Sequence, residues 1–224
     1  MPLLSVIVPV YNEANTIKTI LEKIEGIALD KEIIVVDDGS IDDSRNILRQ
    51  LKYDNLKVIH HSSNRGKGSA VATGLSQASG EFVIIQDADL EYDPQDYLRL
   101  LEKIKENSAD IILGARFTKG YHGLLVPRIG NRLVTGLMNL LFLQNLNDCL
   151  TCYKLFRGQT VSGLHLTARG FDIEIEIIAK AIKKHLRIDE VPISYLPRSY
   201  KEGKKIRWKD GIWAMLSIIK YRFS

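Results

Sequence analysis

The chain has 224 residues, of which 45% are hydrophobic and 26% charged, a balance that excludes a disordered or fibrous protein and fits one large globular domain. The formal net charge is +4, but residues 198–224 hold eight Lys or Arg and two Asp or Glu, a charge of +6, which leaves −2 for the rest. We therefore expect this basic segment to contact phosphates or an anionic membrane.

Short β-branched runs alternate with stretches of helical periodicity through the first half of the chain. In chain order the sequence predicts strands over 4–10, 32–36, 56–60, 82–85 and 111–114, and helices over 17–27, 42–51, 67–78 and 96–106. This alternation predicts an α/β fold with a Rossmann-like, mostly parallel sheet and helices on both faces.

The pattern changes after residue 116. A Gly-rich loop over 119–123 precedes an uncharged stretch, 133–143, which is too short for a bilayer span of about 20 residues and predicts a core helix or an interfacial segment. Further elements are predicted at 153–156 (strand), 172–184 (helix), 188–196 (strand broken by Pro192) and 209–221 (helix). Cys149 and Cys152 form a lone C-x-x-C without the second ligand pair of a zinc site, so we interpret them as incidental thiols.

Acidic residues follow the predicted strands at their carboxyl ends, where open parallel sheets bind ligands. Asp37 and Asp38 follow the second strand, Asp87 and Asp89 follow the fourth, and the turn over 9–13 follows the first. Turn capping explains Asp37 or Asp38 equally well when each is taken singly. Taken together, the residues indicate one polar crevice.

Asp87 and Asp89 stand at positions i and i+2, which point to the same side of an extended segment, so the two carboxylates can share one cation. Hard oxygen ligands that are few in number suit Mg²⁺ or Mn²⁺, which completes its shell with water and substrate phosphates. Glu91 is a candidate third ligand.

Gly66–Val71 lacks the third Gly of a dinucleotide fingerprint, and no P-loop motif occurs.

Four motifs of the first half occur in a specific order: PVYNE at 9–13, VVDDGS at 35–40, NRGKGSAVATG at 64–74 and QDADLEYDP at 86–94. This set resembles the family 2 inverting glycosyltransferases with the GT-A fold. The later motifs resemble the dolichol-phosphate mannose synthase branch of that family: GARF at 114–117, PRIGNR at 127–132, YKLFRG at 153–158 and EVPISYLPRS at 190–199.

The resemblance implies roles for individual residues. Those implied to hold the nucleotide are Pro9, Tyr11, Glu13, Val36 and Asp38, with Asp38 accepting a hydrogen bond from the base. Those implied to hold the metal and the diphosphate are Asp87, Ala88, Asp89 and Glu91, and Glu91 stands where that branch often has Gln. Those implied to grip the phosphates of donor and acceptor are Arg116, Arg132, Arg198 and Lys204 or Lys205.

The implied function is transfer of mannose or glucose from a GDP- or UDP-linked donor to a polyprenyl (dolichyl or undecaprenyl) phosphate, with inversion at the anomeric carbon. We expect Asp89 and Arg116 to be catalytic. A phosphate acceptor is already anionic and needs no general base. A soluble saccharide hydroxyl, the alternative acceptor, needs one, and Asp148 or Glu176 is the candidate. A non-catalytic nucleotide-sugar binding module is the remaining alternative, against which intact Asp87 and Asp89 argue.

We predict a single domain over 1–224, with a nucleotide-sugar half over 1–116 and an acceptor half over 117–224. No secretion leader precedes the first predicted strand, so we expect a cytoplasmic protein, peripheral on the cytoplasmic membrane face, with no nucleic-acid partner. The last helix has apolar residues at helical spacing next to basic ones, which fits packing on the sheet or contact with anionic lipid: Trp208, Ile212, Met215, Leu216, Ile219 and Phe223, beside Lys209, Lys220 and Arg222.

Overall fold

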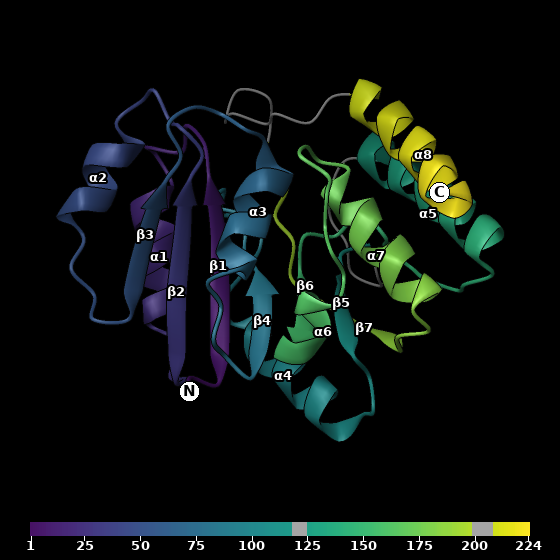
Figure 1. The fold of residues 1–224 in the computed structure, drawn as a ribbon, viewed down its shortest axis with the longest axis horizontal. Coiled ribbons are helices and arrows are strands. Elements are labelled where there is room, and N and C mark those ends of the chain that lie inside the picture. The colour runs from purple at the N-terminus through teal and green to yellow at the C-terminus, as the bar shows by residue number, and fades with distance from the viewer. Residues whose placement is uncertain (118–124, 199–207) are drawn as a thin grey trace.

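The computed structural model describes residues 1–117, 125–198 and 208–224, and a seven-stranded sheet runs through it (Figure 1). The strand order is β3-β2-β1-β4-β6-β5-β7. The strands are β1 (Leu4–Val10), β2 (Lys31–Asp37), β3 (Leu56–His60), β4 (Phe82–Ile85), β5 (Ile111–Ala115), β6 (Lys154–Arg157) and β7 (Ile188–Pro192). All neighbouring pairs are parallel except those of β6, which is antiparallel to both β4 and β5. The mostly parallel α/β sheet expected from the sequence is confirmed.

The two predicted halves of the chain share this sheet. Strand β6, from the predicted acceptor half, lies between β4 and β5 of the predicted nucleotide half, with Phe82 opposite Arg157 and Ile111 opposite Phe156. Strand β7 extends the sheet beyond β5 and ends at Pro192, which has no N–H to donate to a neighbouring strand. The strand expected over 188–196 is therefore shorter than predicted.

Helices cover both faces of the sheet, with α3 in front of β1 and β2 and α1 behind β2 (Figure 1). The helices are α1 (Ile17–Glu25), α2 (Ser44–Gln50), α3 (Lys67–Leu75), α4 (Asp96–Glu106), α5 (Leu125–Phe142), α6 (Gly158–Ser162), α7 (Ile173–Lys183) and α8 (Trp208–Phe223). In α1 the apolar residues recur at helical spacing and all are fully buried: Ile17, Ile20, Leu21 and Ile24.

Small residues allow α3 to lie directly on the sheet. A Cβ on Gly74 would stand 2.4 Å from Ile7 Cγ2, closer than packed atoms allow. At the start of the helix, Gly66 has φ +94°, and a Cβ there would meet the carbonyl oxygen of Arg169 at 2.3 Å. The glycines therefore bring the first turn of α3, with Lys67, to the carboxyl edge of the sheet.

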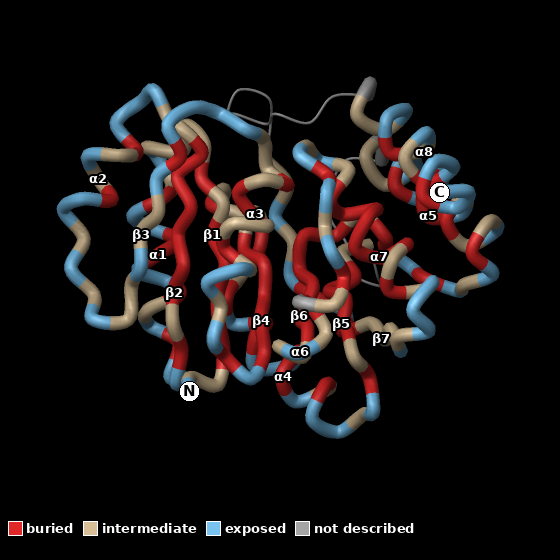
Figure 2. Tube along the Cα trace, in the orientation of Figure 1, coloured by how far each residue is buried: buried red, intermediate tan, exposed pale blue. Residues whose placement is uncertain are grey.

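The uncharged stretch 133–143 belongs to the longer helix α5, which contacts α8, and α8 in turn contacts α7. Figure 2 shows buried residues on the inner sides of these helices and exposed residues on their outer sides. Helix α8 therefore packs on α5 and α7, whereas the sequence analysis left packing on the sheet and contact with lipid as the two alternatives. Of the described residues, no helix combines the length and the apolar character needed to cross a bilayer.

Cys149 and Cys152 are both buried, free thiols. Burial raises the pKa of Cys149 to about 12 and that of Cys152 well above its ordinary value, so neither is reactive near neutral pH. The interpretation of this pair as structural thiols agrees with their surroundings. The predicted loop over 119–123 lies outside the described residues.

Candidate active site

Hydrogen bonds join the turn after β1 to the turn after β2. The Asn12 backbone N–H donates to Ser40 Oγ (3.0 Å), the Ile41 N–H donates to Asn12 Oδ1 (2.9 Å), and the Glu13 N–H donates to Ser44 Oγ (2.9 Å). Asn12 has φ +53°, a conformation that Asn adopts more readily than most residues. Of the residues expected to hold the nucleotide, Tyr11 and Glu13 lie in the turn that these bonds fix. Pro9 lies in β1 and is paired with the buried Val36 of β2.

Asp38 is almost completely buried and fixes the loop that enters α3. Its carboxylate accepts the backbone N–H groups of Arg65 (3.0 Å) and Gly66 (2.7 Å) and contacts His61 Nδ1 at 2.6 Å. Its neighbour Asp37 orders the loop after β2 through hydrogen bonds with Ser40, His60 and Arg45. Burial would raise the pKa of Asp37, but these hydrogen bonds lower it below the ordinary value. The contact of Asp38 with a nucleotide base stays a prediction.

The segment after β4 that carries Asp87 and Asp89 forms a turn, whereas we expected an extended segment. β4 ends at Ile85, and Leu90 has φ +64°, a strained value for a residue with a branched side chain. Ala88 is buried beneath the turn. The two acidic side chains meet different cations: Asp87 Oδ1 lies 2.8 Å from Lys67 Nζ, and Asp89 Oδ2 lies 3.2 Å from Arg198 Nη2.

A buried chain of charges leads from Asp87 into the protein. Lys67 Nζ also lies 2.9 Å from Glu174 Oε1, and the fully buried Lys154 binds the other carboxylate oxygen of Glu174. Burial would raise the pKa of Glu174, but Lys154 and Lys67 lower it, so the carboxylate stays ionised. The sequence analysis missed Lys67, Lys154 and Glu174. The available signal was the placing of Glu174 among the isoleucines at the start of helix α7.

Arg198 approaches the crevice from the segment after β7. Its guanidinium contacts Glu13 (Nη1–Oε2, 3.1 Å) and Asp89, which brings together the turns after β1 and β4. Arg198 thus lies beside the turns after β1 and β4, where a phosphate grip was expected, and is held there by carboxylates. Arg132 is exposed on α5, next to the buried Asn131, whose Oδ1 accepts a bond from Arg116 Nη2 at 3.4 Å. Lys204 and Lys205 lie outside the described residues.

Among the described residues, carboxylates outnumber cations in the network of contacts around Asp87 and Asp89. Five carboxylates linked through these contacts face three side-chain cations, a net charge of −2: Glu13, Asp87, Asp89, Glu91 and Glu174 against Lys67, Lys154 and Arg198. Burial, followed by the charges of Asp87 and Glu91, raises the pKa of Asp89 to about 7. One divalent cation would neutralise this excess, so Asp87 and Asp89 fit Mg²⁺ or Mn²⁺.

Glu91 differs from the other two predicted metal ligands. Its Oε2 accepts from the Tyr195 hydroxyl at 2.8 Å and its Oε1 accepts from the Arg198 backbone N–H at 2.8 Å. In the described part of the chain, no three His, Cys, Asp or Glu side chains are grouped to hold a metal ion. A metal at Asp87 and Asp89 would therefore take ligands from water and substrate phosphates, and the ligand role of Glu91 stays a prediction.

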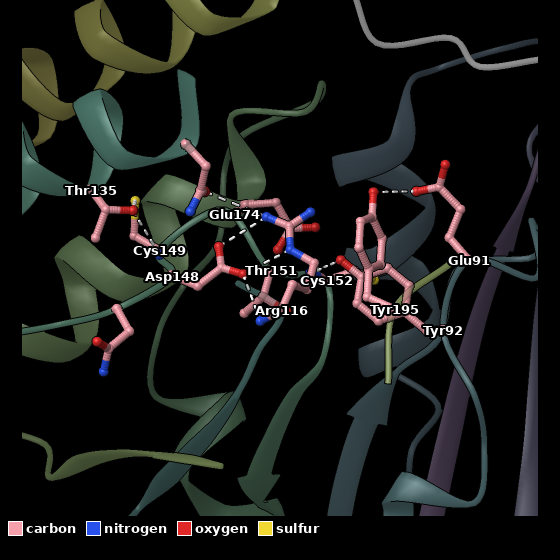
Figure 3. Close-up of polar contacts among 12 residues, drawn as sticks. Glu91, Tyr92, Arg116, Thr135, Asp148, Cys149, Thr151, Cys152, Glu174 and Tyr195 are labelled. Atoms are coloured by element: carbon pink, nitrogen blue, oxygen red, sulfur yellow. Dashed lines mark hydrogen bonds and ion pairs between the residues drawn. The ribbon is translucent and has the colours of Figure 1, made fainter. Parts of the chain in front are cut away.

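Arg116 and Asp148 form a buried two-point ion pair (Figure 3). Arg116 Nε lies 2.7 Å from Asp148 Oδ2, and Nη2 lies 2.8 Å from Oδ1. Asp148 is fully buried, and the Arg116 guanidinium packs against the rings of Phe117 and Tyr195. The pair joins the end of β5 to the segment before β6. The Asp148 side chain is not exposed to solvent, and both of its oxygens are bound to Arg116.

Glu176, the other candidate base, has a similar role on α7. It is fully buried and accepts the N–H groups of Thr167 and Ala168 and the ammonium of Lys180. Burial would raise the pKa of Glu176, but these hydrogen bonds lower it. Both candidate bases are therefore buried and paired with cations, and the role of either as a base stays a prediction. Glu176 fixes the loop that covers the start of α3.

The fold is the GT-A fold. It matches the crystal structure of glucosyl-3-phosphoglycerate synthase from Mycobacterium tuberculosis in complex with Mn²⁺, UDP and glucosyl-3-phosphoglycerate with a TM-score of 0.77 at 20% identity, over 99% of this chain and 80% of that one. Residues 5–162 match the family described as "Glycosyl transferase family 2", and the chain belongs to this family.

Two curated relatives resemble the chain over most of its length. A dolichol-phosphate mannosyltransferase from Pyrococcus furiosus is 32% identical over 89% of this chain, and a dolichyl-phosphate β-glucosyltransferase from Saccharomyces cerevisiae is 29% identical over 86%. The chain spans 58% of the first relative and 66% of the second.

The buried ion pair predicts that Asp148→Asn destabilises the fold. Arg116 would keep its charge without a counter-ion, and breaking a buried pair costs about 3 kcal/mol of unfolding free energy. Urea unfolding measures this cost, with the exposed Asp43→Asn as a matched control that we expect to be neutral. An Asp148→Asn protein as stable as wild type would contradict the structural role of the pair.

The raised pKa of Asp89 predicts a pH-dependent stability in EDTA. The ordinary pKa is 3.8 and the folded value is about 7, so between these values the folded protein keeps a proton that the unfolded chain has lost. Stability should therefore fall as pH rises from about 4 to 7 and then level off, and Asp89→Asn should lose this part of the slope. Equal pH slopes for wild type and Asp89→Asn in urea unfolding would contradict the assignment.

Proposed function

We propose that this protein is a metal-dependent inverting glycosyltransferase that moves mannose or glucose from a GDP- or UDP-linked donor to a polyprenyl phosphate. The observation that carries the proposal is the pair Asp87 and Asp89 at the carboxyl edge of the sheet, flanked by Lys67 and Arg198 within a network of net charge −2. A divalent cation and the diphosphate of a nucleotide sugar are complementary to such a mixed array of carboxylates and cations.

The donor would lie across the ends of β1, β2 and β4. Pro9 in β1, the turn carrying Tyr11 and Glu13, and the loop fixed by Asp38 would hold the nucleotide, and Asp87 and Asp89 would hold Mg²⁺ or Mn²⁺. When bound, the cation would offset the negative charge that develops on the departing diphosphate. The complexes of the M. tuberculosis enzyme with Mn²⁺ or Mg²⁺ and UDP support this arrangement for the same fold.

The reaction would be a single displacement. An oxygen of the acceptor attacks the anomeric carbon, the bond from that carbon to the diphosphate oxygen breaks, and the nucleoside diphosphate leaves with the electron pair, which inverts the configuration. Lys67 and Arg198 would stabilise the departing diphosphate from two sides, because cations placed where charge develops lower the barrier.

A phosphate acceptor suits this site better than a hydroxyl acceptor. A phosphate monoester brings its own anionic nucleophile, so no proton has to be removed. A hydroxyl requires a base, and Asp148 and Glu176 are both buried and paired. The names of the two curated relatives, which act on dolichyl phosphate, support the same choice. Arg116, Arg132 and Arg198 are the described residues that we propose for the acceptor phosphate.

Helices α5 and α8 would present the protein to the membrane that holds such an acceptor. One face of α8 packs inward through Ala214, Ile218 and Tyr221. The outer faces carry exposed apolar residues at helical spacing, Ile129, Leu133 and Leu140 on α5 and Ile212, Trp213, Leu216, Ile219 and Phe223 on α8. The exposed Arg132, Lys220 and Arg222 stand beside them. Apolar residues flanked by cations fit the interface of an anionic bilayer.

The donor and the metal are tested by thermal shift with GDP and UDP in Mn²⁺, followed by transfer assays with GDP-mannose and UDP-glucose. We expect transfer to a polyprenyl phosphate that stops in excess EDTA, and a loss of about a hundredfold or more in Asp89→Asn, because the metal supplies several kcal/mol of charge stabilisation. Asp43→Asn is the matched control. Full activity in EDTA would exclude the need for a metal. Transfer to phosphoglyceric acid and not to a polyprenyl phosphate would exclude the proposed lipid acceptor.

Membrane contact predicts salt-sensitive binding to vesicles of phosphatidylcholine with phosphatidylglycerol and weaker binding to phosphatidylcholine alone. Trp213→Glu should lower vesicle co-sedimentation by about tenfold, since it replaces an exposed apolar side chain, which would enter the lipid, with a charge that the anionic lipid repels. The control is Ile41→Glu, at an exposed apolar position that lies before α2 and outside α5 and α8. Equal binding of the two variants, or no vesicle binding at low salt, would show that these faces do not contact lipid.

A further inference from the structure

Gln86 is a fully buried amide that stands between the end of β4 and the acidic turn, residues 87–91. Its side-chain oxygen Oε1 accepts hydrogen bonds from the hydroxyls of Tyr97 at 2.6 Å and Tyr153 at 2.5 Å. Its side-chain nitrogen Nε2 donates to the backbone oxygen of Asp87 at 2.9 Å. The amide therefore connects the first residue of the acidic turn to two distant parts of the chain.

The two tyrosines that bind Gln86 are themselves held in place. Tyr97 lies in the first turn of α4, Tyr153 directly precedes β6, and both side chains are fully buried. Their ring centroids lie 5.7 Å apart, and the Gly114 N–H donates to the Tyr153 backbone oxygen at 2.8 Å. Burial raises the pKa of both hydroxyls well above the ordinary value, so both stay protonated and can donate to Gln86.

A second buried contact holds the other end of the acidic turn. Tyr92, which directly follows the turn, is buried, and its hydroxyl accepts the backbone N–H of Cys152 at 3.0 Å (Figure 3). The rings of Tyr92 and Tyr153 also pack together, with centroids 4.6 Å apart. Cys152 and Tyr153 are consecutive residues, so one short segment before β6 binds the residues on both sides of the acidic turn.

The conformation of the acidic turn requires such anchors. Leu90 has φ +64°, and a strained backbone of this kind persists only where the surrounding structure holds it. Both polar side-chain atoms of Gln86 have hydrogen-bond partners, and a satisfied buried network is rigid. The network is therefore suited to keep the turn in one conformation.

We propose that Gln86 is a positioning residue, which together with Tyr97 and Tyr153 holds the acidic turn in the conformation that receives a divalent cation and a diphosphate. Gln86 acts through the backbone of Asp87, since its own side chain is buried beneath the turn and bound on both sides. The effect on ligand binding rests on the proposed function, whereas the effect on the turn itself does not.

Two variants separate this role from a contribution to stability alone. Gln86→Met removes the amide at similar volume and leaves two buried hydroxyls without their acceptor, which destabilises a protein. Adding Tyr97→Phe and Tyr153→Phe removes these hydroxyls as well, so the triple variant should regain stability. The triple variant still lacks the hydrogen bond to the Asp87 oxygen. Tyr221→Phe, at a buried tyrosine of α8 outside this network, is the matched control.

The experiment combines urea unfolding, calorimetry of UDP and GDP binding in Mn²⁺, and amide hydrogen exchange over residues 87–91 without ligand. Gln86→Met should lower the urea midpoint by about 1 M and weaken nucleotide affinity by about tenfold, with faster exchange in the turn. The triple variant should recover at least about half of the midpoint loss, while its affinity stays about tenfold weaker and its exchange fast. Tyr221→Phe should change neither the affinity nor the exchange.

Two results would overturn the proposal. The first is a triple variant whose nucleotide affinity and exchange return to wild-type values together with its stability, because the network would then only stabilise the fold. The second is Gln86→Met with wild-type affinity and wild-type exchange over residues 87–91. If the wild-type protein binds neither nucleotide, the proposed function fails, and the exchange rates alone decide the role of Gln86. Should Gln86→Met not fold, the triple variant is compared directly with wild type.

Discussion

The structure depends on how it accommodates carboxylates at the carboxyl edge of a buried parallel sheet. Removing a carboxylate from water costs several kcal/mol unless a cation or several N–H groups face it. Asp38 meets backbone N–H groups and a histidine, Asp87 meets Lys67, and Asp89 meets Arg198. The raised pKa of Asp89 indicates that these partners do not offset all of the charge. The remaining excess is what makes this edge suited to a divalent cation.

The same contacts assemble the site from distant parts of the chain. Lys67 at the start of α3 connects Asp87 to Glu174 on α7, and Arg198 connects the turns after β1 and β4. The predicted nucleotide half and acceptor half therefore meet through charged side chains, in addition to the insertion of β6 between β4 and β5.

The sequence predicted the local elements well, because apolar periodicity is a local property: the strands over 56–60 and 82–85 and the helix over 96–106 have the expected bounds. It did not predict the place of β6, since pairing of Phe82 with Arg157 depends on contacts across the whole chain. The motifs identified the acidic crevice through Asp87 and Asp89. They did not identify Lys67 and Glu174 as partners, or the ion pairs of Asp148 and Glu176, because the burial of a charge is decided by tertiary packing.

The central claim is that Asp87 and Asp89 bind a divalent cation together with the diphosphate of a nucleotide. A crystal structure of the protein with Mn²⁺ and UDP or GDP, with data collected at the manganese absorption edge, tests it most directly. The account predicts one anomalous peak bonded to Asp89, with the diphosphate beside Lys67 and Arg198. A bound nucleotide without manganese at these carboxylates, or manganese bound elsewhere, would contradict it.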